Sequence, residues 1–378
     1  MPRKTLIVIV VAIVATICHT SCNSTTPTDQ ATQPARGIYH WKATYNPTPW
    51  ELRFLKDHHI QRLYIRMFDV DQNPEYNTDY PIIPIATTRF LQPLPDSMEI
   101  IPCVYITNNA LKQDDKMSTL AARIYNRLSE ISACNGFTFS EVQLDCDWTT
   151  STRARYFDLC NNLKQQLSRK NITLSSTMRL YQLSDTSLSN IPVDRTTLMC
   201  YNLGGLQDGR TDNSILDYSK AKPFFSHAKS LPQNMDVAYP TFGWGVVFRY
   251  HYLALPSLRI PQVYYTEYWG LVHSTDFSNK DLYILYEPYE KDSLQISHWY
   301  RVLENHTIDG FELRSDLCNE PLAIDYIREE HGEISQITQL QDHLASIYHA
   351  PHTTIIYHLD SASLSYYTHD EIEQILSR

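Results

Sequence analysis

The segment that decides the fold reads EVQLDCDWT and runs from Glu141 to Thr149. Alternate residues of a strand share one face, so Gln143, Asp145 and Asp147 lie together while the apolar residues between them face the other way. Outward residues of a barrel strand pack beneath helices and are apolar, so the polar row is expected to face the barrel interior. Two carboxylates near the carboxyl end of such a strand lie where these barrels place their active sites, and their repulsion favours a raised pKa for one of them.

Further segments rich in β-branched and aromatic residues precede and follow this one, with helical patterns between them. The expected strands are 38–45, 62–70, 99–107, 141–148, 172–183, 196–202, 235–242 and 310–314, and the expected helices include 117–134, 153–167, 295–304 and 321–329. Prolines interrupt the segment after the second strand, where no helix is assigned. Eight strands that alternate with helices predict an α/β fold, a (β/α)8 TIM barrel.

The barrel is expected to occupy residues 37–332 and to carry two additions. Residues 246–294 are too long for a simple βα connection and are crowded with Tyr and Trp, which predicts an aromatic-rich insertion after strand seven. Residues 333–378 show a helical pattern, a strand pattern over 353–359 and a second helix over 369–376, and they are expected to form a small C-terminal α/β extension.

The N-terminal segment has the pattern of an export signal followed by a tether. A charge-free apolar run, 6–17, is shorter than the ~20 residues of a spanning helix but suits a signal peptide. The tetrad HTSC ending at Cys22 resembles a lipobox, so residues 1–22 are the expected signal and Cys22 the lipidation site. Residues 23–36 form a polar, flexible tether. We expect an exported lipoprotein anchored to the outer membrane or cell surface, with a periplasmic or secreted protein as the alternative.

Composition excludes several classes of protein. The chain of 378 residues is 43% hydrophobic and 20% charged, which excludes a disordered protein, and its net charge of -10 argues against a nucleic-acid partner. Only 10 residues are Gly, and no phosphate-loop, dinucleotide or zinc-ligand spacing occurs, so neither a cofactor nor a metal is expected. The 26 Tyr suit stacking on sugar rings and core packing equally, and no feature indicates the oligomeric state.

Two short motifs resemble a known family. DCDW at 145–148 resembles the core of the family 18 glycoside hydrolase signature, in which Asp-x-x-Asp-x-Asp-x-Glu ends strand four. MCYN at 199–202 is similar to that family's Met-x-Tyr-Asp on strand six, and the aromatic insertion resembles its inserted subdomain. The chain also resembles Bacteroidetes lipoproteins with glycosidase-like barrels that share a QLDCDWT-type strand. The resemblance implies a (β/α)8 barrel that acts on a glycan or oligosaccharide.

The departures from the family pattern bear directly on activity. Thr149 stands where the family has its proton-donating Glu, Val142 stands at the first Asp, and Asn202 replaces the strand-six Asp. In the family the Glu protonates the leaving oxygen while the preceding Asp orients the substrate's acetamido group. Threonine cannot serve as a general acid near neutral pH. Two hypotheses therefore stand: a glycosidase with its acid elsewhere, or a non-catalytic glycan-binding lipoprotein.

The candidate site residues follow from these strands. Asp145 and Asp147 are the expected catalytic pair, and Glu312, on the expected eighth strand, is the expected acid. Arg179 shares the inward face of strand five and could instead hold either aspartate in a structural ion pair. The expected substrate-binding residues are Trp41, Arg66, Asp69, Gln143, Arg179, Tyr201, Asn202, Tyr239 and Trp244. Trp244 lies between two glycines and suits a sugar platform, with core packing as the alternative.

Overall fold

The computed structural model describes residues 34–75, 81–113, 116–184, 191–227, 231–253, 262–273, 286–289, 297–316 and 322–378. The expected signal peptide, Cys22 and most of the tether lie outside these residues. None of the described helices has the length and hydrophobicity needed to cross a bilayer.

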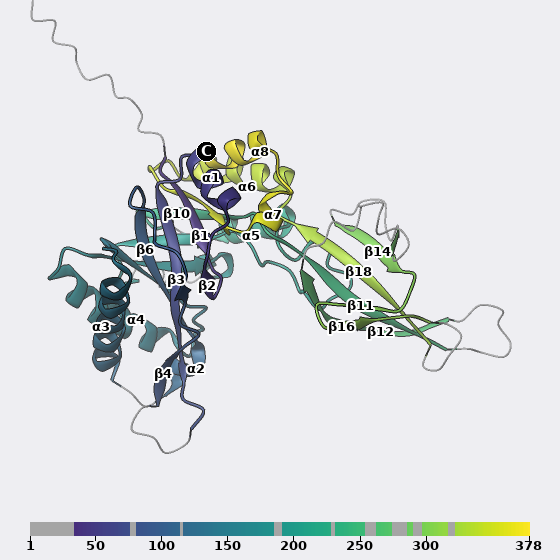
Figure 1. Cartoon of the computed structure of the whole chain (residues 1–378), viewed down its shortest axis with the longest axis horizontal. Helices are drawn as coiled ribbons and strands as arrows, with labels where there is room; N and C mark the ends of the chain where they lie inside the picture. Colours follow the sequence, from purple (N-terminus) through teal and green to yellow (C-terminus); the bar gives the residue numbers. More distant parts are fainter. Residues whose placement is uncertain are drawn as a thin grey trace, which may run out of the picture. The chain divides into compact units, whose positions relative to one another are not determined.

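Eight parallel strands form a closed barrel, which confirms the predicted (β/α)8 fold (Figure 1). In ring order they are β1 (Arg36–His40), β3 (Arg62–Gln72), β6 (Glu99–Ile106), β7 (Glu141–Asp145), β8 (Thr173–Arg179), β9 (Arg195–Met199), β10 (Met235–Pro240) and β19 (Thr354–Tyr357). The ring closes because β1 pairs in parallel with both β3 and β19. The outward residues Val142 and Leu144 of β7 are fully buried beneath the helices, as the alternation predicts.

Helices follow most of the barrel strands and cover the outside of the barrel. They are α1 (Pro49–Asp57), α2 (Asn108–Lys112), α3 (Met117–Asn135), α4 (Arg153–Ser168), the 3-10 helix η1 (Leu180–Ser184), α5 (Tyr218–His227), α6 (Ile334–Ile347), α7 (Ser361–Leu364) and α8 (His369–Leu376). Helices α3 and α4 lie side by side, because each presents its apolar stripe to neighbouring strands (Figure 1).

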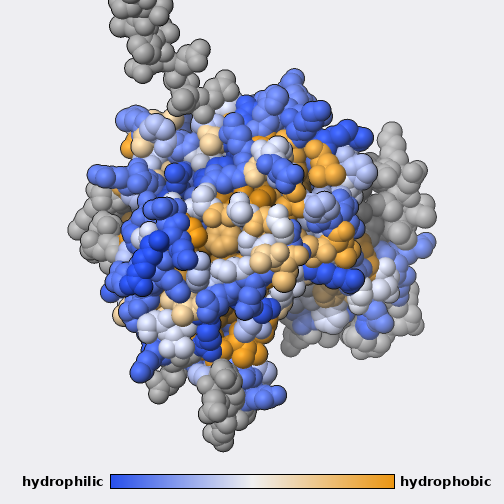
Figure 2. Space-filling model, turned by 60° about the vertical axis from the view of Figure 1, so that its left-hand side comes forward, coloured by the Kyte–Doolittle hydropathy of each residue, from blue (hydrophilic) through white to orange (hydrophobic). Residues whose placement is uncertain are grey.

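The described part of the segment between β3 and β6 holds strands in place of a helix. There β4 (Ile82–Ile85) pairs antiparallel with β3, while β5 (Arg89–Phe90) pairs with β2 (Thr44–Tyr45). Prolines at 81 and 84 explain why a strand forms here and a helix does not, since proline suits an edge strand and breaks a helix. An apolar groove of about 150 Å³ lies between β4 and α3. Figure 2 turns the α3 and α4 side toward the viewer and shows hydrophobic surface among hydrophilic residues.

A second, antiparallel sheet interrupts the barrel between β10 and α6. Its strands run in the order β12 (Gln262–His273), β11 (Gly243–Leu253), β18 (Ala323–His331), β14 (His298–Val302) and β13 (Tyr286–Pro288), and β17 (Ser315–Asp316) pairs with β18. A separate hairpin joins β15 (His306–Ile308) to β16 (Phe311–Leu313). The aromatic-rich segment after strand seven is therefore a sheet that spans residues 243–331, wider than the expected 246–294.

The assignment of the eighth barrel strand to 310–314 is wrong. Residues 311–313 form β16 of the hairpin, and the ring is completed by β19. The two segments have similar β-forming composition, but a parallel strand needs a crossover before it, and α6 supplies that crossover ahead of β19. Residues 333–378 are consequently part of the barrel, and are not an appendage to it.

The two helices expected at 295–304 and 321–329 are also wrong where the structure describes them. The first contains β14 and the second contains most of β18. All nine residues of β18 are buried, because the strand lies between β11 and β14 with both faces covered. A strand buried on both faces shows no alternation of apolar and polar residues, so its period could not be told from that of a helix.

A buried arginine ties this sheet to the loop that follows β9. Arg328 is fully buried and donates to the carbonyl oxygens of Leu206 at 3.1 Å, Asp208 at 2.9 Å and Thr211 at 2.6 Å. Its Nε donates to Glu330 Oε1 at 2.5 Å. Because the arginine is buried and bonded to three carbonyl oxygens of the loop and to Glu330 of the sheet, it holds the two in one arrangement.

Candidate functional site

A cavity of about 290 Å³ lies at the carboxyl ends of the barrel strands. It is lined by Trp41, Arg66, Asp69, Tyr105, Asp145, Asp147, Arg179, Met199, Tyr201, Asn202 and Tyr357. These residues lie on seven of the eight barrel strands or in the turns that follow them. The seven strands are β1, β3, β6, β7, β8, β9 and β19. This is the end of the barrel where (β/α)8 enzymes carry their active sites.

Gln143 forms part of the floor beneath the cavity. Tyr39 donates its hydroxyl hydrogen to Gln143 Oε1 at 2.6 Å, and Gln143 Nε2 donates to Thr197 Oγ1 at 3.0 Å. The amide is fully buried and both its ends are hydrogen-bonded within the barrel. Gln143 therefore positions the residues above it and does not line the cavity, although it was expected to bind substrate.

Asp145 is a buried acid at the cavity wall. Its side chain accepts a hydrogen bond from Thr177 Oγ1 at 2.6 Å, and the residue is only 3% exposed. Burial raises its pKa from 3.8 to about 6; Arg179 and the Thr177 hydrogen bond oppose this shift, and the charges of Asp147 and Asp69 add to it. Desolvation is thus the main cause of the raised pKa that repulsion alone was expected to produce.

Two arginine–aspartate pairs lie on the same cavity wall. Arg179 donates from Nε to Asp147 Oδ1 at 2.5 Å and from Nη2 to Oδ2 at 3.2 Å. Arg66 pairs in the same two-point manner with Asp69, with Nε at 2.7 Å from Oδ1 and a second bond from Nη2 to Oδ2. The ion pair considered as the structural alternative for Arg179 is therefore present, but its aspartate keeps 37% of its side chain exposed.

Aromatic rings complete the wall around these charges. The ring centroids of Tyr201 and Tyr357 are 5.1 Å apart, and those of Trp41 and Tyr357 are 6.1 Å apart. Burial raises the pKa of Tyr105 to about 12, with Asp147 and Asp145 adding to the effect, so its hydroxyl stays protonated. The guanidinium carbon of Arg179 lies 5.7 Å from the centroid of the Tyr201 ring.

Two polar atoms on this wall have no protein partner in the described structure. Arg179 Nη1 and Tyr201 Oη are both buried, and neither makes a hydrogen bond to any described residue. Buried polar groups are nearly always hydrogen-bonded, so an unpaired one needs an explanation. Both atoms belong to residues of the cavity wall, where a ligand with hydroxyl groups could pair with them.

Thr149, at the position of the family's acid, does not line the cavity. Its hydroxyl lies 2.9 Å from Ser151 Oγ and 3.3 Å from Thr152 Oγ1, at the start of α4. The side chain takes part in the turn before that helix, so it offers the cavity neither a proton nor a charge.

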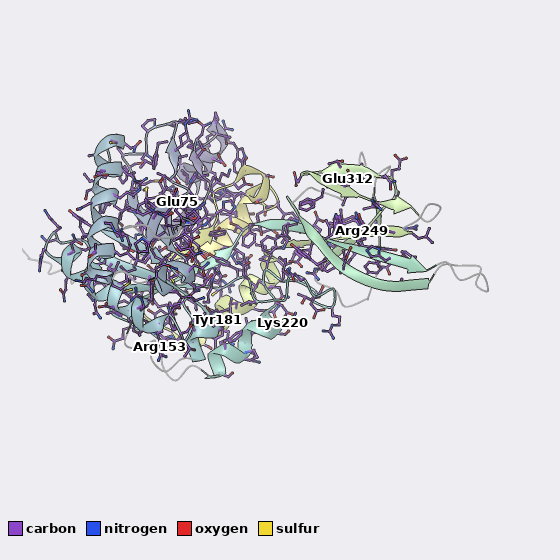
Figure 3. All side chains as sticks on the ribbon, turned by 90° about the horizontal axis from the view of Figure 1, so that it is seen from below. Glu75, Arg153, Tyr181, Lys220, Arg249 and Glu312 are labelled. Atoms are coloured by element: carbon purple, nitrogen blue, oxygen red, sulfur yellow. The ribbon has the colours of Figure 1, made fainter. Side chains whose placement is uncertain are left out.

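Three more of the predicted site residues lie away from the cavity wall. Trp244 donates its indole hydrogen to Glu330 Oε2 at 2.8 Å and packs against Phe242, while Tyr239 is buried in the barrel. Glu312 is exposed on β16 of the separate β15–β16 hairpin (Figure 3), so its expected position on barrel strand eight is wrong. Trp244 and Glu312 belong to segments whose end or partner strand was assigned incorrectly, whereas Tyr239 lies within β10 as expected and is buried there.

Three cavity residues were not predicted from the sequence. Tyr105 and Met199 lie at the carboxyl ends of β6 and β9, and Tyr357 is the last residue of β19. The alternation along β6 could have identified Tyr105, which lies on the same face as Cys103, two residues before it. Tyr357 could not have been found without knowing that β19 closes the ring.

No protein-family model matches the chain, and no curated protein is similar to it in sequence. Among solved structures, a chitinase from Chromobacterium violaceum ATCC 12472 is 11% identical with a TM-score of 0.51, over 91% of this chain and 99% of the other. Ostrinia furnacalis Group IV chitinase is 11% identical with a TM-score of 0.51, over 91% and 98%. The Bacillus cereus spore cortex-lytic enzyme SleL is 12% identical with a TM-score of 0.50, over 91% and 73%. The chain therefore shares the (β/α)8 barrel fold of these three enzymes.

Proposed function

We propose that the barrel binds a glycan in the cavity at the carboxyl ends of its strands. The observation that carries the proposal is the pair of buried polar atoms, Arg179 Nη1 and Tyr201 Oη, which lack protein partners and belong to the cavity wall. Trp41 and Tyr357 add aromatic rings to the same wall. A sugar offers hydroxyl groups for the first kind of contact and C–H faces for the second. The likeness of the fold to chitinases supports a carbohydrate as the ligand class.

Binding without cleavage is the form of the proposal that the geometry supports best. Thr149 replaces the family's acid and faces the turn before α4. The Asp147 carboxylate is held at both oxygens by Arg179, which leaves it suited to orient a ligand and unsuited to donate a proton. A cavity built from paired charges and aromatic rings can bind a sugar without cleaving it.

Hydrolysis is the second candidate, and the state of Asp145 favours it. A general acid works best when its pKa lies near the operating pH, and burial raises the pKa of Asp145 to about 6. Asp147 and Asp69 are the other two carboxylates of the cavity wall. In this alternative Asp145 protonates the leaving oxygen and Asp147 stabilises the positive charge that develops on the sugar.

One experiment separates the two candidates. The full chain and its Asp147→Asn variant are titrated with chito-, cello-, xylo- and malto-oligosaccharides by calorimetry, and each mixture is assayed for new reducing ends. We expect one class to bind without cleavage, and Asp147→Asn to weaken binding about tenfold or more because Arg179 loses its charged partner. Asp342→Asn, in an exposed pair with Arg378, is the matched control and should bind as the wild type does.

Two other results would contradict the proposal that the cavity binds a glycan without cleaving it. Reducing ends that form with the wild type and Asp342→Asn but vanish in Asp145→Asn would replace it with the hydrolase. Absence of binding to every glycan class, by a protein that is folded by circular dichroism, would overturn both candidates.

We further propose that the chain is exported and held at a membrane through lipid on Cys22. The support is the apolar run 6–17, the lipobox-like tetrad before residue 23 and the polar tether 23–36. In a bacterial host, metabolic labelling with palmitate should mark the wild type and leave Cys22→Ser unlabelled and released from the membrane fraction. Cys18→Ser is the matched control, and equal labelling of wild type and Cys22→Ser would contradict the assignment.

A further inference from the structure

A cluster of metal-ligating side chains lies at the other end of the barrel from the cavity. His58 follows the end of α1, and its carbonyl oxygen accepts a hydrogen bond at 3.0 Å from Arg36, the first residue of β1. His369 and Glu373 belong to α8, the last helix of the chain. The amino ends of the barrel strands thus carry a group that the proposed glycan site does not use.

The three side chains bring two nitrogens and one oxygen together. One ligand atom from each of His58, His369 and Glu373 lies within 4.8 Å of the others. His58 Nδ1 is 2.8 Å from Glu373 Oε1, and the two imidazole rings stack with centroids 4.5 Å apart at an angle of 28°. The side chains therefore already face a common point.

The local structure explains why they converge. His369 and Glu373 are four residues apart and so share one face of α8, whose start is fixed by a capping box at Thr368. The ring of His58 packs on Phe54 of α1 at 4.4 Å, and the residue is buried. Arg36 Nη1 contacts Glu373 Oε2 at 3.0 Å, so the carboxylate is held from outside in the manner of an outer-shell partner.

We propose that His58, His369 and Glu373 form a binding site for a divalent cation of the zinc type. Two imidazoles and a carboxylate with a water as fourth ligand are a ligand set that tetrahedral zinc uses. Ligand distances of ~2.0–2.2 Å would draw the three atoms to about 3.4 Å from one another, which requires a small rotation. His369 is exposed and free to make that rotation.

A cation at this site would take the place of a contact that is present in the structure. A histidine binds a metal through a neutral ring nitrogen, and His58 Nδ1 now lies 2.8 Å from Glu373 Oε1. For ligation through Nδ1 its proton moves to Nε2, and the cation replaces the present hydrogen bond to Glu373.

A cation at this site would link the first helix of the barrel to the last. Strands β1 and β19 pair at the seam where the ring closes, and α1 and α8 follow those two strands. A ligand that binds only the folded chain stabilises it by mass action. The expected role of the site is therefore to hold the seam closed, independently of any ligand in the glycan cavity.

The test measures zinc and cobalt binding to the full chain and to three variants. With zinc chloride at about a hundredfold excess over its Kd, the Tm of the wild type should rise by about 5 °C. Cobalt should give the visible absorption bands of a tetrahedral complex. His369→Ala and Glu373→Gln should each lower the zinc affinity at least tenfold and abolish the cobalt bands, and His58→Gln should do the same.

His349→Ala removes another exposed imidazole and serves as the matched control, which should retain both signals. Because His369 is exposed, its loss leaves the fold intact and the variant remains informative if the His58 variant does not fold. Zinc affinity that is equal in the wild type, His369→Ala and Glu373→Gln would overturn the proposal. So would the absence of cobalt bands in the wild type.

Discussion

Replacing Asp145 with asparagine should make the stability of the chain less dependent on pH. The pKa of Asp145 lies at about 6 in the folded chain because of burial, against an ordinary value of 3.8. A folded-state pKa above the ordinary value means that the protonated side chain stabilises the fold below pH 3.8, and that this contribution is lost as the pH rises through about 6. Asparagine cannot ionise, but it keeps an oxygen that accepts the Thr177 hydrogen bond.

The two pKa values set the size of the effect. Their separation corresponds to about 3 kcal/mol in the free energy of unfolding, and about 2.5 kcal/mol of it develops between about pH 4 and pH 8. Relative to the wild type, Asp145→Asn should therefore gain about 2.5 kcal/mol over this range. The residue is 3% exposed, so solvent does little to screen the penalty.

Urea unfolding at a series of pH values, followed by tryptophan fluorescence at constant ionic strength, measures this difference directly. Asp342→Asn provides the matched control, because its side chain is 67% exposed and should change stability little at any pH. A difference between Asp145→Asn and the wild type that stays constant from pH 4 to pH 8 would refute the reasoning. A variant that grows less stable with rising pH would show that Arg179 outweighs burial.

The remaining predictions concern the second sheet and the cavity wall. Arg328→Met should destabilise the chain by about 3–5 kcal/mol in denaturant unfolding, since it leaves Glu330 buried without its cation. Arg210→Met removes an arginine that is 91% exposed and should leave stability nearly unchanged; equal losses in the two variants would contradict this. Gly243→Ala should lower stability by about 1–3 kcal/mol because the new Cβ would lie 2.3 Å from His331 Nδ1, while at Gly209 the nearest atom is 3.7 Å away and Gly209→Ala should be tolerated. Trp41→Ala should weaken glycan binding measured by calorimetry at least tenfold, and Trp269→Ala, exposed on β12, should leave it unchanged; the reverse order would place the binding surface on the second sheet.

The strands with one apolar and one polar face could be predicted from the sequence. On β7 the alternation of Gln143 and Asp145 showed which side faces the barrel, and Asp147 follows two residues after the strand ends. Helices α3 and α4 begin at the residues that periodicity indicated. β18 could not be recognised in this way, because burial of both faces removes the alternation.

Much of the candidate site could be predicted because polar residues at strand ends are informative. Arg66, Asp69, Asp145, Asp147 and Arg179 were all expected near the site, and the structure brings them to one cavity. The pairing of each arginine with its aspartate was harder to predict, because it depends on strand order and register. Glu312 was misplaced for the same reason, as its strand pairs in a hairpin and not in the ring.

The position of β19 in the ring has a consequence for how the protein folds during its synthesis on the ribosome. β1 is the first barrel strand to be made and β19 the last, and β19 lies between β1 and β10. Until residue 357 has emerged, β1 and β10 each keep an unpaired edge, which is a surface open to wrong pairing. The second sheet ends at His331, so its strands are all available before the barrel can close. Synthesis thus delivers the inserted sheet first, and the barrel, whose strands lie before and after that sheet in the sequence, closes last.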